Sequence, residues 1–201
     1  MDTFRDIREN FRFLVLETTK QVEAARAALR APERVDFERA EIRDDYIDNL
    51  KTLVENRCFQ SLNETPGLGK PEVNALKAYY TVAVNLERAA DFANNIVHQT
   101  QYFYRPEVRS RFEFEPTFEV ILDALAKVPT AAERKEVDSA LGICRAEKQT
   151  DGLYRNVYDA IVSALREPDG ADTQDLVTVL FIHHYLERIG DALLNIGEAI
   201  I

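Results

Sequence analysis

Apolar side chains recur every three or four residues through most of the chain, which is the spacing of one face of an α-helix. The pattern is clearest near the C-terminus, where the steps alternate between three and four residues. The apolar row there is Val179, Ile182, Leu186, Ile189, Leu193, Ile196 and Ile200. A second row has the same spacing with smaller side chains: Tyr79, Val82, Leu86, Ala89, Ala93 and Ile96. Rows of this kind are typical of long antiparallel helices that pack at shallow angles.

Proline and glycine divide this pattern into segments. The clearest breaks are at Pro32, 63–71 and 167–170, and weaker ones are at Pro106, Pro116 and Pro129. Because proline cannot continue a helix from within, these positions predict helix boundaries. The expected fold is all-α, with six long helices over 3–30, 34–62, 72–104, 108–127, 130–166 and 172–200. In the fourth of these, phenylalanines alternate with acids, so a short extended stretch would also fit.

The chain contains an internal repeat. Residues 85–96 align with residues 185–196 at an offset of 100, and six of the twelve positions are identical. The segments before them align more loosely, 44–50 with 147–153, at an offset of 103. The sequence therefore predicts two tandem pseudo-symmetric three-helix bundles, residues 1–104 and 105–201.

Four pairs of acids occupy the same register in both repeats. They are Asp44/Asp48, Glu87/Asp91, Glu147/Asp151 and Glu187/Asp191. Acids four residues apart share one helix face, and like charges there destabilise a helix by roughly 0.2–0.5 kcal/mol per pair. A divalent or trivalent cation reverses that sign, since carboxylate oxygens are hard ligands suited to Mg²⁺, Ca²⁺, Mn²⁺ or iron.

These eight acids are therefore candidate metal ligands. Asn95 and Asn195 each follow an acid pair by four residues, and they join the candidate set. The alternative is an acidic patch that holds no ion and pairs with arginines from neighbouring helices.

The composition of the chain argues against several classes of function. With 25 Lys and Arg against 35 Asp and Glu, the formal net charge is −10. Such a surface repels phosphate groups, which disfavours nucleic-acid binding and attachment to anionic lipid. Two cysteines are too few for a disulfide framework, the charged N-terminal stretch is no signal peptide, and no apolar run is long enough to span a membrane. A cytoplasmic protein without a membrane span is expected.

Catalytic motifs are lacking. The sequence has no glycine-rich phosphate loop, no G-x-S-x-G and no H-E-x-x-H. None of the three histidines, His98, His183 and His184, completes the Glu-x-x-His motif of di-iron carboxylate enzymes. The expectation is a protein that is not an enzyme. The alternatives are a carboxylate-bridged metalloenzyme on a helical bundle and a metal-free helical interaction scaffold.

The repeated helix resembles a known signature. Leu-Glu-Arg-Ile-Gly-Asp at 186–191, followed by Asn195-Ile196, is similar to the signature helix of the PhoU family of bacterial phosphate-uptake regulators. Leu-Glu-Arg-Ala-Ala-Asp at 86–91 resembles the equivalent helix of that family's first repeat. The acids at 44–50 and 147–153 resemble its second-helix motifs, and the resemblance extends from about residue 5 to 200.

The resemblance implies two pseudo-symmetric three-helix bundles with multinuclear metal sites on the acidic surfaces, holding iron or zinc in some members. The preference of carboxylates for hard cations adds magnesium to the expected metals. The resemblance also implies a cytoplasmic, often dimeric protein that represses phosphate uptake and phosphate-starvation gene expression. The implied partners are the ATPase of a phosphate ABC transporter and a sensor histidine kinase. The chain departs from the family pattern at Ala89-Ala90, where Ile-Gly is usual, and around the fifth helix's second acid, which lies between Thr150 and Gly152.

Overall fold

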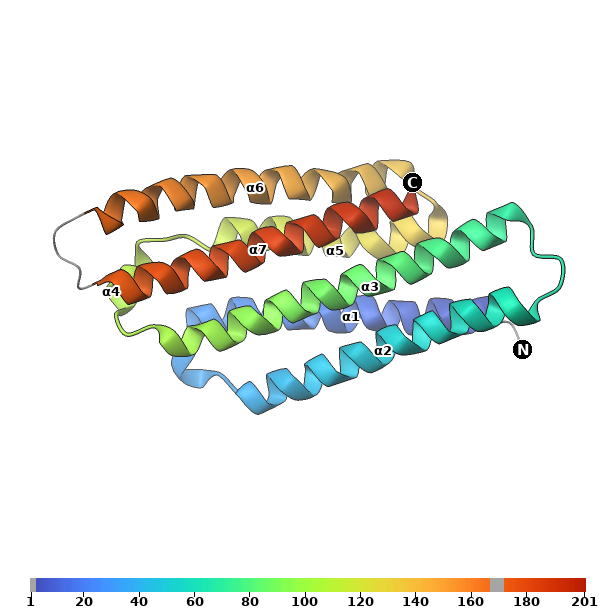
Figure 1. The fold of residues 1–201 in the computed structure, drawn as a ribbon, viewed down its shortest axis with the longest axis horizontal. Coiled ribbons are helices and arrows are strands. Elements are labelled where there is room, and N and C mark those ends of the chain that lie inside the picture. Colours follow the sequence, from blue (N-terminus) through green and yellow to red (C-terminus); the bar gives the residue numbers. More distant parts are fainter. Residues whose placement is uncertain (1–2, 167–171) are drawn as a thin grey trace.

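The computed structural model describes residues 3–166 and 172–201, which form six long helices and one short one (Figure 1). The long helices are α1 (Thr3–Arg30), α2 (Phe37–Glu64), α3 (Lys70–Gln99), α5 (Glu115–Arg134), α6 (Val137–Leu165) and α7 (Thr173–Ile200). The short elements are α4 (Pro106–Ser110) and the 3₁₀ turns η1 (Pro32–Arg34) and η2 (Thr100–Tyr102). No strand occurs within the described ranges, so the all-α prediction is confirmed. None of the described helices combines the length and the apolar character of a membrane span.

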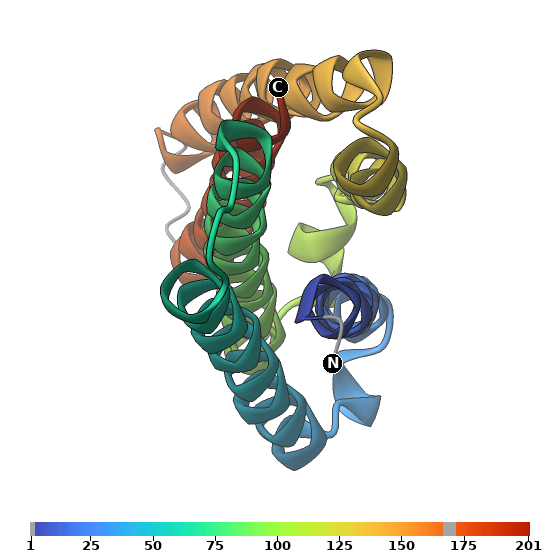
Figure 2. The same cartoon turned by 90° about the vertical axis from the view of Figure 1, so that its right-hand side faces the viewer.

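The long helices form two groups that meet along α3 and α7 (Figure 2). α1 and α2 pack against α3, while α5 and α6 pack against α7. α3 and α7 run side by side in opposite directions, so that Phe92 stacks on Tyr185 and Asn85 reaches Asn195. The larger of the two hydrophobic clusters among the described residues contains residues of both groups. The division into residues 1–104 and 105–201 stays a prediction.

Both predicted apolar rows face the core. All six residues of the α3 row are buried, and so are six of the seven in the α7 row, with Ile200 partly buried at the end of the helix. Leu86 and Leu186 are completely buried at equivalent positions of the two helices. Each fully buried Leu or Ile stabilises the fold by about 1.5–3 kcal/mol, so these two rows hold the two helical groups together.

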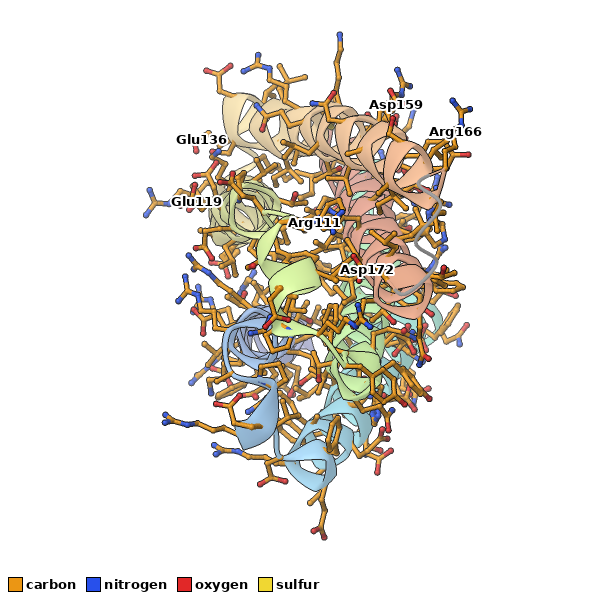
Figure 3. The ribbon with its side chains drawn as sticks, turned by 90° about the vertical axis from the view of Figure 1, so that its left-hand side faces the viewer. Arg111, Glu119, Glu136, Asp159, Arg166 and Asp172 are labelled. Carbon is orange, nitrogen blue, oxygen red and sulfur yellow. The ribbon has the colours of Figure 1, made fainter. Side chains whose placement is uncertain are left out.

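The predicted helix over 108–127 is wrong. α3 ends at Gln99 rather than at residue 104, and the chain then forms η2 and α4 before α5 begins at Glu115. The start of α7 anchors this connection. The buried Asp175 accepts hydrogen bonds from the backbone N–H groups of Tyr104 and Arg105, at 2.8 and 3.2 Å. Asp172 pairs with Arg105 and Arg111, each at 2.9 Å, at the end of the bundle shown in Figure 3.

Pro129 lies inside a helix, contrary to the prediction of a boundary there. α5 continues to Arg134 and stops where Lys135 adopts a left-handed conformation with φ of 52°, so the next helix begins at Val137 rather than at residue 130. Val128 and Ala131, on either side of the proline, are completely buried. Their packing offsets the hydrogen bond that the proline nitrogen cannot make. The predicted break at 167–170 falls outside the described residues.

α6 and α7 approach closely at two glycines. A Cβ atom on Gly190 would collide with Oγ1 of Thr150, and one on Gly197 would lie 2.9 Å from the carbonyl oxygen of Ala140 and collide with Sγ of Cys144. At the equivalent positions α3 carries Ala90 and Val97, which are both buried. The second helical group is therefore packed more tightly than the first between its two acid-bearing helices.

Candidate functional site

The acids of the first repeat gather between α2 and α3. We call Asp44, Asp48, Glu87 and Asp91 the first acidic cluster. The ammonium group of Lys51 lies among them, since its Nζ is 2.7 Å from Oδ1 of Asp48 and 3.5 Å from Oε1 of Glu87. The side chains of Lys51 and Glu87 are each only 19% exposed, whereas that of Asp48 is 60% exposed. The lysine thus connects the two helices and neutralises part of the cluster.

Asp91 has the most perturbed carboxyl group of this cluster. Its pKa is raised to about 7, first by burial and then by the charges of Glu87, Asp44 and Asp48, while Lys51 acts in the opposite direction. All four carboxyl groups are therefore close enough to influence one another. Proton uptake by Asp91 is one way to reduce this repulsion, and a bound cation would be another.

Asp44 lies at the more buried side of the same cluster. Its pKa is raised by burial and by Glu41, while a hydrogen bond with Asn94 acts to lower it. Asn94 is itself held by Gln21, whose Nε2 donates to Oδ1 of Asn94 at 3.2 Å. Oδ1 of Asp44 is buried and has no hydrogen-bond partner among the described residues. A buried carboxylate oxygen without a partner is energetically costly, so it is a suitable ligand for a cation.

The acids of the second repeat lie between α6 and α7. We call Glu147, Asp151, Glu187 and Asp191 the second acidic cluster. Arg188, on the same helix as two of them, donates from Nε and a terminal nitrogen to Glu187 at 2.8 and 2.7 Å, and lies 2.9 Å from Asp191. Arg155 pairs with Asp151 at 2.8 Å.

Asp191 shows how the second acidic cluster differs from the first. Its pKa is raised by burial and then by Glu187 and Asp151, while Arg188 and Arg88 lower it. Glu147 is not among the main causes of this shift, and it forms no ion pair within residues 3–166 and 172–201. The second cluster therefore brings three of its four acids together, and each of the three is already paired with an arginine.

The two candidate asparagines lie elsewhere. Nδ2 of Asn195 donates to Oδ1 of Asn85 on α3 at 3.1 Å, so Asn195 belongs to the contact between α3 and α7. Asn95 is exposed, and it forms no hydrogen bond within the described part of the chain. Successive steps of four residues turn a row by about 40° each on a helix of 3.6 residues per turn, which moves Asn195 away from Glu187.

Neither cluster has the geometry of a preformed metal site. Within the described residues, no group of three His, Cys, Asp or Glu side chains is arranged to hold a metal ion. The carboxylates instead pair with Lys51, Arg155 and Arg188, which lie on the acid-bearing helices themselves. Of these three, Lys51 also reaches an acid of the neighbouring helix, Glu87. Lys51 was missed from the sequence, although its place three residues after Asp48 was a signal for an ion pair. The donors of the first cluster still fit a hard cation, because all are carboxylates and one oxygen is buried without a partner.

Both clusters lie in segments that match known proteins. The family model described as the PhoU domain matches residues 14–100 and, a second time, residues 117–200. The chain belongs to the PhoU family. Two curated relatives are named phosphate-specific transport system accessory protein PhoU homolog. The one from Clostridium acetobutylicum is 24% identical over 181 residues, covering 86% of this chain and 80% of its own length. The one from Zymomonas mobilis is 27% identical over 164 residues, covering 79% of this chain and 66% of its own length.

Solved PhoU structures share the fold. Crystal structures of PhoU from Pseudomonas aeruginosa and of the phosphate transport system regulatory protein PhoU from Streptococcus pneumoniae superpose with TM-scores of 0.88 and 0.86. They cover 99% and 98% of this chain, and it covers 95% and 92% of theirs, at 20% and 18% identity. The PhoU-like helical arrangement is thus confirmed over the whole described length.

Proposed function

We propose that this chain is a regulatory accessory protein of a phosphate transport system and that it acts through protein–protein contacts rather than by catalysis. The observation that carries the proposal is the double match to the PhoU domain, which covers both acidic clusters. The names of the curated relatives support it, since all those described above are accessory proteins of phosphate-specific transport. The lack of a nucleophile or redox motif in the sequence is consistent with a role that requires no turnover.

The proposed partners follow from the family resemblance. They are the ATPase of a phosphate ABC transporter and a sensor histidine kinase. The chain contacts both on the cytoplasmic side of the membrane. In this role the chain works as a homodimer and represses phosphate uptake and starvation signalling when phosphate is abundant.

Metal binding is part of the proposal. The first acidic cluster would hold the ion through Asp44, Asp48, Glu87 and Asp91. The metal, which could be iron, zinc or magnesium, would supply positive charge that holds α2 against α3. For the second cluster we propose the same role for Glu147, Asp151, Glu187 and Asp191, where an ion competes with two arginines. Each arginine pair favours the metal-free form, so we expect the first cluster to bind more tightly.

The regulatory role can be tested by deletion of the gene in its own cell. Phosphate uptake and a phosphate-starvation reporter should both rise in medium rich in phosphate, and the wild-type gene on a plasmid should restore repression. Uptake and reporter activity that stay at the wild-type level after deletion contradict the proposal.

Metal binding needs a separate measurement. Elemental analysis of protein purified without a histidine tag should show bound metal in the wild type and less in the Glu87→Gln/Asp91→Asn variant. The matched control is Glu119→Gln/Asp159→Asn, which removes the same charge from exposed acids on the outer surface (Figure 3). Equal metal content in both variants contradicts a site at the first cluster, and no metal in any sample favours a metal-free scaffold.

A further inference from the structure

A groove of about 860 Å³ lies along the first half of α3, bordered by the C-terminal end of α7 and the end of α5. Four cationic side chains line it, and we call this surface the basic groove: Lys70, Lys77, Arg88 and Lys135. Glu198 is its single acidic side chain. The groove is separate from the metal candidates, except that Asn195 forms part of its wall.

The four cations are grouped in one groove. Within residues 3–166 and 172–201 none of them forms a salt bridge, although the molecule carries a net charge of −10. Several exposed cations elsewhere in the described residues also form none, so it is the grouping that distinguishes these four. Elsewhere arginines such as Arg12 and Arg188 lie against carboxylates. Arg88 is near enough to Asp191 to lower the pKa of that acid, but the two form no ion pair. Like charges gathered in one groove repel one another, so an anionic partner would stabilise this surface.

The length of the groove favours an extended partner over a compact one. Its polar residues on α3 follow helical spacing along one face: Lys70, Asn74, Lys77, Thr81, Asn85 and Arg88. At 1.5 Å per residue, the distance along the helix from the first to the last of these is about 27 Å. An isolated phosphate or a single nucleotide would contact only part of this row. About eight residues of extended peptide, at about 3.3 Å each, match its full length.

The wall that α7 contributes to the groove is partly aliphatic. Ala199 and Ile200 line it beside Asn195 and Glu198. An apolar side chain between two acids of a peptide would fit against this wall, as apolar walls with a few polar groups are usual in binding sites. A chain of phosphates offers no such apolar group.

We propose that the basic groove binds an extended, acidic segment of a partner protein, with its carboxylates facing Lys70, Lys77, Arg88 and Lys135. The inference rests on the proposed function in taking the partner to be a protein. It adds the chemistry of the contact: the net charge of the whole molecule would favour basic partners, whereas this groove selects an acidic one.

The probe is a fluorescein-labelled peptide of about ten residues, rich in Glu and with two Leu, and binding is followed by fluorescence anisotropy. The Lys70→Glu/Lys77→Glu variant should bind at least about tenfold more weakly than the wild type. Both lysines are exposed, so the fold is preserved, which thermal unfolding checks. The matched control is Arg145→Glu/Lys148→Glu on the exposed side of α6, which makes the same change in net charge and should leave the affinity within about twofold.

Raising the salt to about 0.5 M should weaken binding strongly, because exposed charges are screened at that ionic strength. Equal affinity of the two double variants, or equal binding of a Lys-rich peptide, overturns the proposal. Binding of ATP or inorganic phosphate without any binding of the acidic peptide also overturns it, in favour of a small-anion site. Failure here leaves the gene-deletion phenotype unaffected, so the two proposals fail separately.

Discussion

The two acidic clusters contain four carboxylates each at equivalent positions, yet they are neutralised by cations from positions that are not equivalent. In the first cluster Lys51 lies between Asp48 and Glu87. Its counterpart in the second repeat is Tyr154, which carries no charge. In the second cluster Arg188 holds Glu187 with two hydrogen bonds. Its counterpart Arg88 makes no ion pair within the described residues and lines the basic groove instead.

We expect this difference to decide how readily each cluster accepts an external cation. Lysine is a compact charge on a flexible chain, whereas arginine holds a carboxylate in a fixed two-point geometry. Lys51 can leave the first cluster by rotation of its side chain, while Arg188 must break two hydrogen bonds to release Glu187. Acids at equivalent positions of the two repeats therefore do not have equivalent ion-pair partners. We expect the basic residues beside the acids to determine which cluster can take up a metal ion.

The largest effect on stability is expected where α6 and α7, the helices of the second cluster, pack most closely. Gly197→Val introduces the residue that α3 carries at position 97, and it should destabilise the protein by about 3 kcal/mol, because the new side chain meets the backbone of Ala140. Urea-induced unfolding measures the change. The control is Gly152→Ala, which has open space around it and should stabilise α6 by up to about 1 kcal/mol. Tolerance of valine at position 197 would mean that the two helical groups pack equally closely.

The next effect concerns cation exchange at the first cluster. Lys51→Met removes the internal cation and should strengthen Mn²⁺ binding by about tenfold, or about 1.4 kcal/mol, because the metal no longer competes with the ammonium group. Isothermal titration calorimetry in a Glu187→Gln background isolates the first cluster. The mirror variant Tyr154→Lys should weaken binding at the second cluster. Weaker Mn²⁺ binding after Lys51→Met would show that the lysine supports the site rather than competing with the ion.

A smaller effect, with a defined pH dependence, is expected for Asp91. Its pKa of about 7 in the folded protein lies above the ordinary value of 3.8. The folded state therefore binds the proton more tightly, and this stabilisation is present at acidic pH and is lost as the pH rises through 7. In metal-free protein, Asp91→Asn should be more stable than the wild type by about 1 kcal/mol at pH 8, a value reduced for partial exposure. The advantage should disappear near pH 4.

Asp191→Asn is the matched comparison for that experiment. Asp191 pairs with Arg188, so its replacement relieves repulsion but also removes an attraction. The free energy of unfolding should change by less than about 0.5 kcal/mol at either pH. Equal pH profiles for the two variants would contradict the difference between the clusters.

The sequence predicted the helical cores better than it predicted the site. The rows ending at Ile96 and Ile200 were correct because burial follows helical periodicity directly, with only Ile200 partly buried at the end of α7. Pro129 was misplaced because buried neighbours can keep a proline inside a helix. The start of α5 was missed because the contacts that fix the preceding connection come from Asp172 and Asp175, about 60 to 70 residues later.

Within the site, the register of the acids was predictable, but their partners were not. The repeat placed eight carboxylates on matching helix faces, and the structure brings seven of them into two groups. Whether a lysine or an arginine nearby turns towards them depends on rotamers and burial, which a sequence does not specify. Lys51 and Arg88 each follow an acid closely in sequence, yet only Lys51 forms an ion pair within the described residues.

The smallest effect is expected at the edge of the second cluster. Arg155→Ala removes a partner of Asp151, but the arginine side chain is 74% exposed, and exposed ion pairs contribute little. The free energy of unfolding should fall by less than about 0.5 kcal/mol, and the loss should vanish at high salt because water and ions screen the pair. Urea unfolding at low and high salt measures both quantities. A loss above about 1 kcal/mol would contradict this expectation, because it would mean that the second cluster depends on an exposed arginine as well as on Arg188.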